Sequence, residues 1–206
     1  AKGDNERAIP DFDRAIKINP NLASAFRGRG LALSDRGDYD RAIADLSQAI
    51  KFDANAATAF NDRGIAYGAK ADHERAIKDF DQVVKLDVKN AVALNNRGIA
   101  YRNQGKYDRA IADFDAAMAI KPDYAVAMYN RGTAYYDKLD YDRAIASFDA
   151  VIKLDPSNVL ALHDRGVARY DQHNYDRAIA DFDQLVKSGV SLVVAQNKDR
   201  STDRLT

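Results

Sequence analysis

Residues 91–124 read AVALNNRGIAYRNQGKYDRAIADFDAAMAIKPDY, and the same 34-residue pattern recurs along most of the chain. One glycine of each copy marks the period, at Gly30, Gly64, Gly98, Gly132 and Gly166. A fixed period of this length predicts a solenoid, in which each repeat buries its apolar face only against its neighbours. The period divides the chain into a partial repeat, five full repeats and a tail: 1–22, 23–56, 57–90, 91–124, 125–158, 159–192 and 193–206.

Each full repeat predicts two helices. In the repeat at 91–124, small or apolar residues recur at helical spacing, as at Leu94, Gly98 and Tyr101, and predict a first helix. Ala110 and Phe114 lie on one face of a predicted second helix, and a glycine-containing turn separates the two. We expect only a second helix in residues 1–22, and a partial capping helix or a disordered tail in residues 193–206.

The array resembles the tetratricopeptide repeat (TPR) family. The family pattern of spaced bulky, Gly, Tyr, Ala, aromatic and Pro positions is met by Leu94, Gly98, Tyr101, Ala110, Phe114 and Pro122. Every full repeat has Arg directly before the Gly, where the family commonly has Leu, so the chain resembles an Arg-Gly variant of the repeat. The resemblance implies an all-α, right-handed superhelical solenoid of antiparallel helix pairs. Its concave face would be lined by the first helices and would commonly hold a peptide or a partner's helix.

The composition excludes several classes of protein. Lys plus Arg and Asp plus Glu both total 31, so there is no basic excess of the kind expected for nucleic-acid binding. No apolar run approaches the roughly 18 residues that span a bilayer, which argues against direct membrane insertion. The chain has no cysteine, and Ala1 to Pro20 has no signal-peptide character. We expect a soluble protein and leave its compartment, cytoplasm or periplasm, undecided.

Neither the acidic triplets nor the histidines predict a reaction centre. In Asp113-Phe114-Asp115 the two carboxylates are two residues apart on a helix and point about 200° apart, so they cannot share one ion. His73, His163 and His173 lack the spacing of a zinc site, and no phosphate loop or nucleophile motif is present. We therefore predict that the protein is not an enzyme and has no catalytic residue, metal site or cofactor.

The arginine before each repeat glycine allows two interpretations. A buried arginine needs carboxylate partners, because an unpaired buried charge is costly. The favoured interpretation is a repeating Arg–Asp pair between helices; the alternative is a cationic stripe for acidic partners. The arginines are Arg29, Arg63, Arg97, Arg131 and Arg165, and the aspartates of matching period are Asp13, Asp81, Asp115, Asp149 and Asp183.

Helical phase predicts which side chains would line the concave groove. Residues of the first helices that face away from the Gly/Ala/aromatic stripe are rich in Asn and Tyr. Asn amides can bond both groups of an extended backbone, and Tyr offers a rigid amphipathic contact. The predicted partner-binding residues are Arg27, Asn61, Asp62, Asn95, Asn96, Arg102, Tyr129, Asn130, Tyr136, His163 and Tyr170.

The leading functional prediction is a protein–protein interaction scaffold that binds a peptide or a partner helix in this groove. One alternative is a self-assembling structural module, with the array ends as surfaces for homo-oligomerisation. Another is the recruiting array of a larger protein whose other domains are absent from this chain.

Overall fold

The structure, a computed structural model, describes residues 2–187, with side chains from Ala8 onward. This part of the chain forms α-helices joined by short turns, without strands, so the predicted all-α fold is confirmed. The predicted tail at 193–206 lies outside the described residues. The helices are α1 (Lys2–Ile18), α2 (Ala23–Asp35), α3 (Tyr39–Phe52), α4 (Ala57–Ala69), α5 (His73–Leu86), α6 (Ala91–Asn103), α7 (Tyr107–Ile120), α8 (Ala125–Asp137), α9 (Tyr141–Leu154), α10 (Val159–Asp171) and α11 (Tyr175–Lys187).

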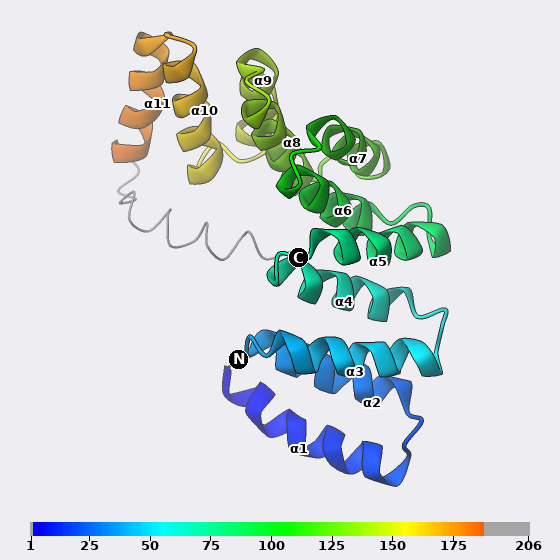
Figure 1. The fold of residues 1–206 in the computed structure, drawn as a ribbon. Helices are drawn as coiled ribbons and strands as arrows, with labels where there is room; N and C mark the ends of the chain where they lie inside the picture. Colours follow the sequence, from blue (N-terminus) through cyan, green and yellow to red (C-terminus); the bar gives the residue numbers. More distant parts are fainter. Residues whose placement is uncertain (1, 188–206) are drawn as a thin grey trace. The chain divides into compact units, whose positions relative to one another are not determined.

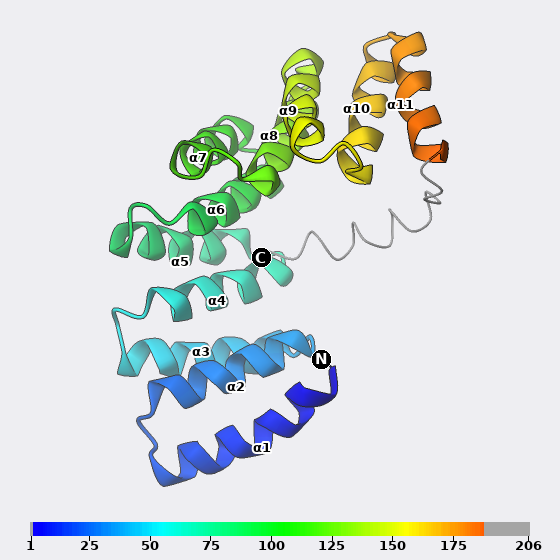
Figure 2. The same cartoon turned by 180° about the vertical axis from the view of Figure 1, so that it is seen from behind.

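Contacts group the chain into two compact units, residues 1–93 and residues 94–206, which we call the N-terminal and C-terminal units. In the N-terminal unit each of α1 to α4 packs against the next helix along the chain. In the C-terminal unit the same holds from α7 to α11 (Figures 1 and 2). Even-numbered helices from α2 to α10 are the first helices of the repeats, and odd-numbered helices from α3 to α11 are the second.

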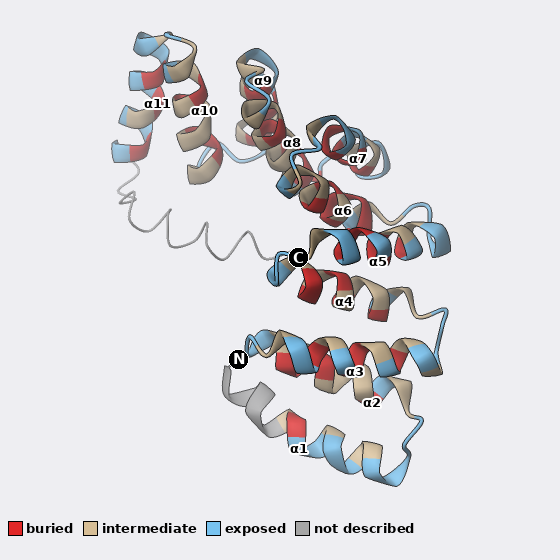
Figure 3. Ribbon diagram, in the orientation of Figure 1, coloured by how far each residue is buried: buried red, intermediate tan, exposed pale blue. Residues whose placement is uncertain are grey.

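A phenylalanine of the second helix packs on the repeat glycine of the first. A Cβ added to Gly132 would lie 2.6 Å from Cε1 of Phe148, and the same distance separates a Cβ on Gly98 from Phe114. Both rings are 0% exposed. Buried residues run along the helices of each unit, whereas the turns are mostly exposed (Figure 3). The glycine is therefore required because any side chain there would displace the ring that fills the space between paired helices.

Capping and turn residues separate the paired helices. Asp140 precedes α9, and its side chain accepts a hydrogen bond from the backbone N–H of Arg143 at 3.3 Å. Such a cap satisfies one of the free N–H groups in the first turn of a helix. The turn before a second helix also contains a left-handed residue, which is Gly105 (φ 71°) in one repeat and Leu139 (φ 62°) in the next. Leu139 adopts this conformation without the freedom of glycine.

The arginine ladder forms ion pairs within each unit. Arg165 of α10 donates from Nη1 to Asp149 of α9 at 2.5 Å, and Arg29 of α2 donates from Nη1 to Asp13 of α1 at 2.6 Å. These are pairs of the kind that the sequence pattern predicts. Arg131 likewise donates to Asp115 at 2.8 Å.

A second carboxylate, which the prediction missed, binds most of the same arginines. Arg165 also donates from Nε and Nη2 to Asp181 of α11, at 3.1 and 2.5 Å. The equivalent bidentate pairs are Arg29–Asp45, Arg63–Asp79 and Arg97–Asp113, whereas Arg131 meets Ser147 instead. In the triplet Asp113-Phe114-Asp115 the acids are thus structural: Asp113 binds Arg97 of its own repeat, and Asp115 binds Arg131 of the following repeat.

Candidate binding groove

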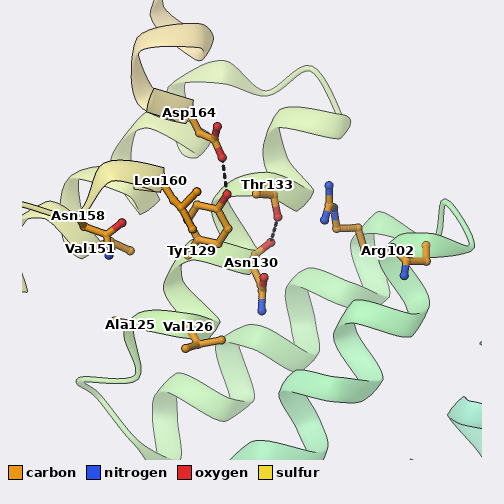
Figure 4. A pocket seen from close by; sticks show the side chains of 11 residues that line it. Arg102, Ala125, Val126, Tyr129, Asn130, Thr133, Val151, Asn158, Leu160 and Asp164 are labelled. Atoms are coloured by element: carbon orange, nitrogen blue, oxygen red, sulfur yellow. Dashed lines mark hydrogen bonds between the residues drawn. The ribbon is translucent and has the colours of Figure 1, made fainter. Parts of the chain in front are cut away.

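The first helices α6, α8 and α10 of the C-terminal unit line a pocket of about 460 Å³, which we call the first-helix pocket (Figure 4). Pockets of this size suit small groups such as one or two side chains of a partner. Val151 of α9 and Asn158, which directly precedes α10, complete its wall. The lining residues are Arg102, Asn103, Ala125, Val126, Tyr129, Asn130, Thr133, Val151, Asn158, Leu160 and Asp164.

One part of the first-helix pocket is apolar. Val126 of α8 is 43% exposed, and Leu160 of α10 lies beside the ring of Tyr129 in Figure 4. Val126 and Leu160 are each the second residue of their helix, in the first turns of α8 and α10. The exposed apolar surface can take up an apolar side chain of a partner.

The other part is polar. Asn130 donates from Nδ2 to Oδ1 of Asn95 at 2.9 Å, and its backbone carbonyl accepts a hydrogen bond from Oγ1 of Thr133 at 2.8 Å. Asn and Thr side chains keep further hydrogen-bonding capacity after one bond each. This part can therefore bind the N–H and C=O groups of an extended chain.

Two tyrosines join α8 to α10. The hydroxyl of Tyr129 donates to Oδ2 of Asp164, and that of Tyr136 donates to Oδ2 of Asp171, both at 2.5 Å. The hydrogen bond to the Asp171 carboxylate, together with burial, raises the pKa of Tyr136 to about 12. The phenol therefore stays protonated and acts as a donor at neutral pH.

Two arginines occupy corresponding places elsewhere. Arg102 of α6 donates from Nε to Asp137 of α8 at 2.6 Å, again across 35 residues. In the N-terminal unit Arg27 of α2 donates to Asp62 of α4 at 2.7 Å. Burial raises the pKa of Asp62, and the hydrogen bond from Arg27 opposes that shift. All these pairs connect the first helices of consecutive repeats.

A smaller pocket of about 190 Å³ adjoins the first and shares Arg102, Thr133 and Asp164 with it. Tyr136 and Val167 line this second pocket but not the first. Asp164 therefore faces both hollows. Its carboxylate also lies 2.8 Å from Nδ1 of His163.

Four predicted groove residues of the C-terminal unit lie at these pockets. Arg102, Tyr129 and Asn130 line the first-helix pocket, and Tyr136 lines the smaller one. Tyr170 lies at the end of α10, 57% exposed, with its ring 5.3 Å from that of Tyr175. The ring of the half-buried His163 is tilted against that of Phe182, with 6.2 Å between centroids, and contacts Asp164.

The structure places the remaining predicted residues differently. Asn95 and Asn96 are 0% exposed, so neither presents an accessible surface to a partner. Asn95 instead accepts the hydrogen bond from Asn130 that joins two first helices. Asp62 is buried and paired with Arg27 in the N-terminal unit, where Asn61 is half-buried.

Val126 and Leu160 were absent from the predicted groove. A sequence signal for them exists at the second position of each first helix. The first two full repeats have Ser24 and Thr58 there, whereas later repeats have apolar residues. The change from polar to apolar at an exposed position indicates a contact surface that the fold itself does not require.

Within residues 2–187, no helix has the length and apolar character needed to cross a membrane. In the same part of the chain, no three His, Asp or Glu side chains gather in an arrangement suited to a metal ion.

Several solved structures share this fold. A crystal structure of MamA is 25% identical in sequence, with a TM-score of 0.72, covering 80% of this chain and 90% of that one. YrrB, described as a TPR protein with an unusual peptide-binding site, is 22% identical, with a TM-score of 0.69 over 91% of this chain and 97% of its own. A tetratricopeptide repeat protein from Parabacteroides merdae is 20% identical, with a TM-score of 0.79 over 90% of this chain and 74% of its own. No curated protein matches the sequence.

Sequence models described as tetratricopeptide repeats or TPR repeats match residues 1–22, 30–70, 57–90, 91–124 and 129–190. The general role that these matches and the related structures support is that of a protein-interaction scaffold. Because the matches extend over most of the chain and the paired helices keep the repeat geometry, this protein belongs to the tetratricopeptide repeat family.

Proposed function

We propose that the protein is a scaffold that binds a segment of a partner protein in the first-helix pocket of its C-terminal unit. The observation that supports this proposal most is the pocket itself, in which apolar and polar side chains from three consecutive first helices line one hollow. Binding sites commonly combine an apolar anchor pocket with a few polar groups that fix orientation.

The two parts of the pocket would act on different parts of the partner. An apolar side chain of the segment enters between Val126, Leu160 and the ring of Tyr129. The adjoining backbone of the segment hydrogen-bonds to Asn130 and Thr133. The apolar contact contributes most of the affinity, and the polar contacts set the direction of the segment.

Val126→Lys tests this proposal, because it places a charge in the apolar part at a side chain that is 43% exposed. Peptides selected from a displayed random library against the full chain would serve as probes, with dissociation constants measured by fluorescence anisotropy. We expect Val126→Lys to weaken binding at least about tenfold, since loss of the anchor contact removes about 1.4 kcal/mol or more.

Leu154→Lys is the matched control. Leu154 is 50% exposed at the end of α9 and does not line the pocket, so the same change of residue should leave the affinity unaltered. Equal binding by wild type and both variants, with unchanged circular dichroism, would show that the partner binds elsewhere. Selection of no peptide at all would count against a peptide-binding role.

A further inference from the structure

Four of the pairs that connect consecutive first helices have an aspartate as acceptor, and their donors are of two chemical kinds. Arg27–Asp62 and Arg102–Asp137 are ion pairs. Tyr129–Asp164 and Tyr136–Asp171 have the same separation of 35 residues, with a tyrosine hydroxyl as the donor. The donor thus changes from arginine to tyrosine toward the C-terminal end of the described chain.

This change removes the positive charge that an arginine donor places beside the aspartate. An arginine supplies both a hydrogen bond and a positive charge, whereas a phenol supplies the hydrogen bond alone. Among residues 8–187 no Lys or Arg forms an ion pair with Asp164 or Asp171. His163 contacts Asp164 through Nδ1, 2.8 Å from its carboxylate.

The charges of Asp164 and Asp171 both act on Tyr136. The pKa of Tyr136 is raised to about 12 by its hydrogen bond to Asp171, then by burial, and the charge of Asp164 contributes to the shift. Asp164 also lines the two pockets described above. Arg102, which lines both pockets too, is paired with Asp137. Within the described residues, Asp164 is therefore the carboxylate without an arginine partner where the proposed function places the segment.

Aromatic rings accompany these charges. Tyr136 pairs with Tyr141 at a centroid distance of 5.7 Å, and Tyr170, which precedes Asp171, pairs with Tyr175 at 5.3 Å. Aromatic faces beside a carboxylate attract a Lys or Arg side chain. The repeat fold does not require a tyrosine at the position of Tyr136, because the equivalent residues of the three preceding repeats are Ser34, Gly68 and Arg102.

We propose that the first-helix pocket binds a basic segment of a partner protein, whose Lys or Arg side chains pair with Asp164 and Asp171. This inference rests on the proposed function and defines the chemistry of the partner: an apolar anchor residue flanked by cationic residues. The partner supplies the positive charges that Arg27 and Arg102 supply in the corresponding pairs.

Three synthetic peptides test the proposal with the full chain. Each is about twelve residues long and has one central leucine in an Ala/Ser frame, and the three differ only in having Lys, Gln or Glu at the flanking positions. Fluorescence anisotropy above pH 7 gives their dissociation constants. We expect the Lys peptide to bind most tightly, and its advantage over the Gln peptide to shrink as salt is raised, because exposed ion pairs are screened.

Asp164→Asn and Asp171→Asn should each weaken binding of the Lys peptide by about fivefold, the factor that corresponds to about 1 kcal/mol for a partly exposed ion pair. Binding of the Gln peptide should change little. Asp183→Asn is the matched control, since it removes the same charge from an exposed position on α11 that lines neither pocket. Tyr136→Arg keeps both aspartates and supplies an internal cation for Asp171, so it should weaken the Lys peptide about as much as Asp171→Asn.

The outcomes separate this inference from the function on which it rests. Equal affinity for the Lys and Gln peptides, with both lost in Val126→Lys, would retain the pocket and overturn the basic partner. Tightest binding of the Glu peptide, or an Asp183→Asn effect as large as that of Asp171→Asn, would overturn it as well. Failure of all three peptides to bind would reject the pocket together with the inference.

Discussion

Replacing Arg63 by Ala would break a buried pair of the arginine ladder. Arg63 donates from Nε and Nη2 to both oxygens of Asp79, at 2.8 and 2.7 Å, and the two side chains are 18% and 6% exposed. Removal of one partner leaves the other charge buried, which costs about 3–5 kcal/mol. Because water can enter beside the partly exposed Arg63 site, we expect the lower end, a loss of about 3 kcal/mol at pH 7.

The corresponding change at Arg131 provides the control. Arg131 meets the hydroxyl of Ser147 at 3.2 Å and the half-exposed Asp115 at 2.8 Å, so its loss leaves no carboxylate buried. Arg131→Ala should therefore cost only about 1 kcal/mol. Urea denaturation followed by far-ultraviolet circular dichroism measures both values.

The pH dependence of Arg63→Ala is a second signature. Burial already raises the pKa of Asp79, and the hydrogen bond from Arg63 opposes that shift. Without Arg63 the folded-state pKa of Asp79 rises further above its value in the unfolded chain. The variant therefore loses stability as the pH rises through this folded-state pKa, and it regains stability as the pH falls. The cost of Arg63→Ala should therefore shrink between pH 7 and about pH 4.5. Equal costs for Arg63→Ala and Arg131→Ala, or a cost independent of pH, would refute the reasoning.

Three further substitutions test the close helix packing and the turns. Gly132→Ala places a Cβ 2.6 Å from the ring of Phe148 and should destabilise the C-terminal unit by about 2 kcal/mol. Urea denaturation measures this loss, and an unchanged midpoint would show that the helix pair accommodates the methyl group without cost. Leu139→Gly should stabilise the same unit by about 0.5–1 kcal/mol, because the left-handed φ of 62° strains a leucine that is 71% exposed and contributes little packing. Gly105→Ala, at a φ of 71°, should have the opposite effect, and the same sign for both changes in thermal melts would contradict this account of the turns.

The period of the sequence was sufficient to predict the helices, because it depends on local spacing. A glycine equivalent to Gly98 stands at the same place in every full repeat, and a phenylalanine equivalent to Phe114 stands in most of them. A small residue on one helix and a large one on the next predict close packing of the two helices from sequence alone. The bidentate carboxylate partners of Arg29, Arg63, Arg97 and Arg165 were missed for a geometric reason. Asp113 lies 16 residues from Arg97, on the other helix of the pair, and only the crossing of the two helices brings them together.

The candidate site was predictable only in part. Helical phase identified Tyr129 and Tyr136, but it could not distinguish a side chain that faces solvent from one that bonds to the next first helix. Asn95 illustrates this limit, since it faces the predicted side yet is buried against Asn130. The contacts across 35 residues depend on how consecutive repeats stack, which no pattern within one repeat encodes.

The central claim, that the first-helix pocket is the binding site, is tested most directly by nuclear magnetic resonance. Isotope-labelled full chain would be titrated with an unlabelled peptide selected from the displayed library, and backbone amide shifts would be followed by residue. We predict that the largest changes fall on Val126, Tyr129, Asn130, Thr133 and Leu160, the pocket residues of α8 and α10. Changes confined to the second helices, or to residues of the N-terminal unit, would contradict the claim.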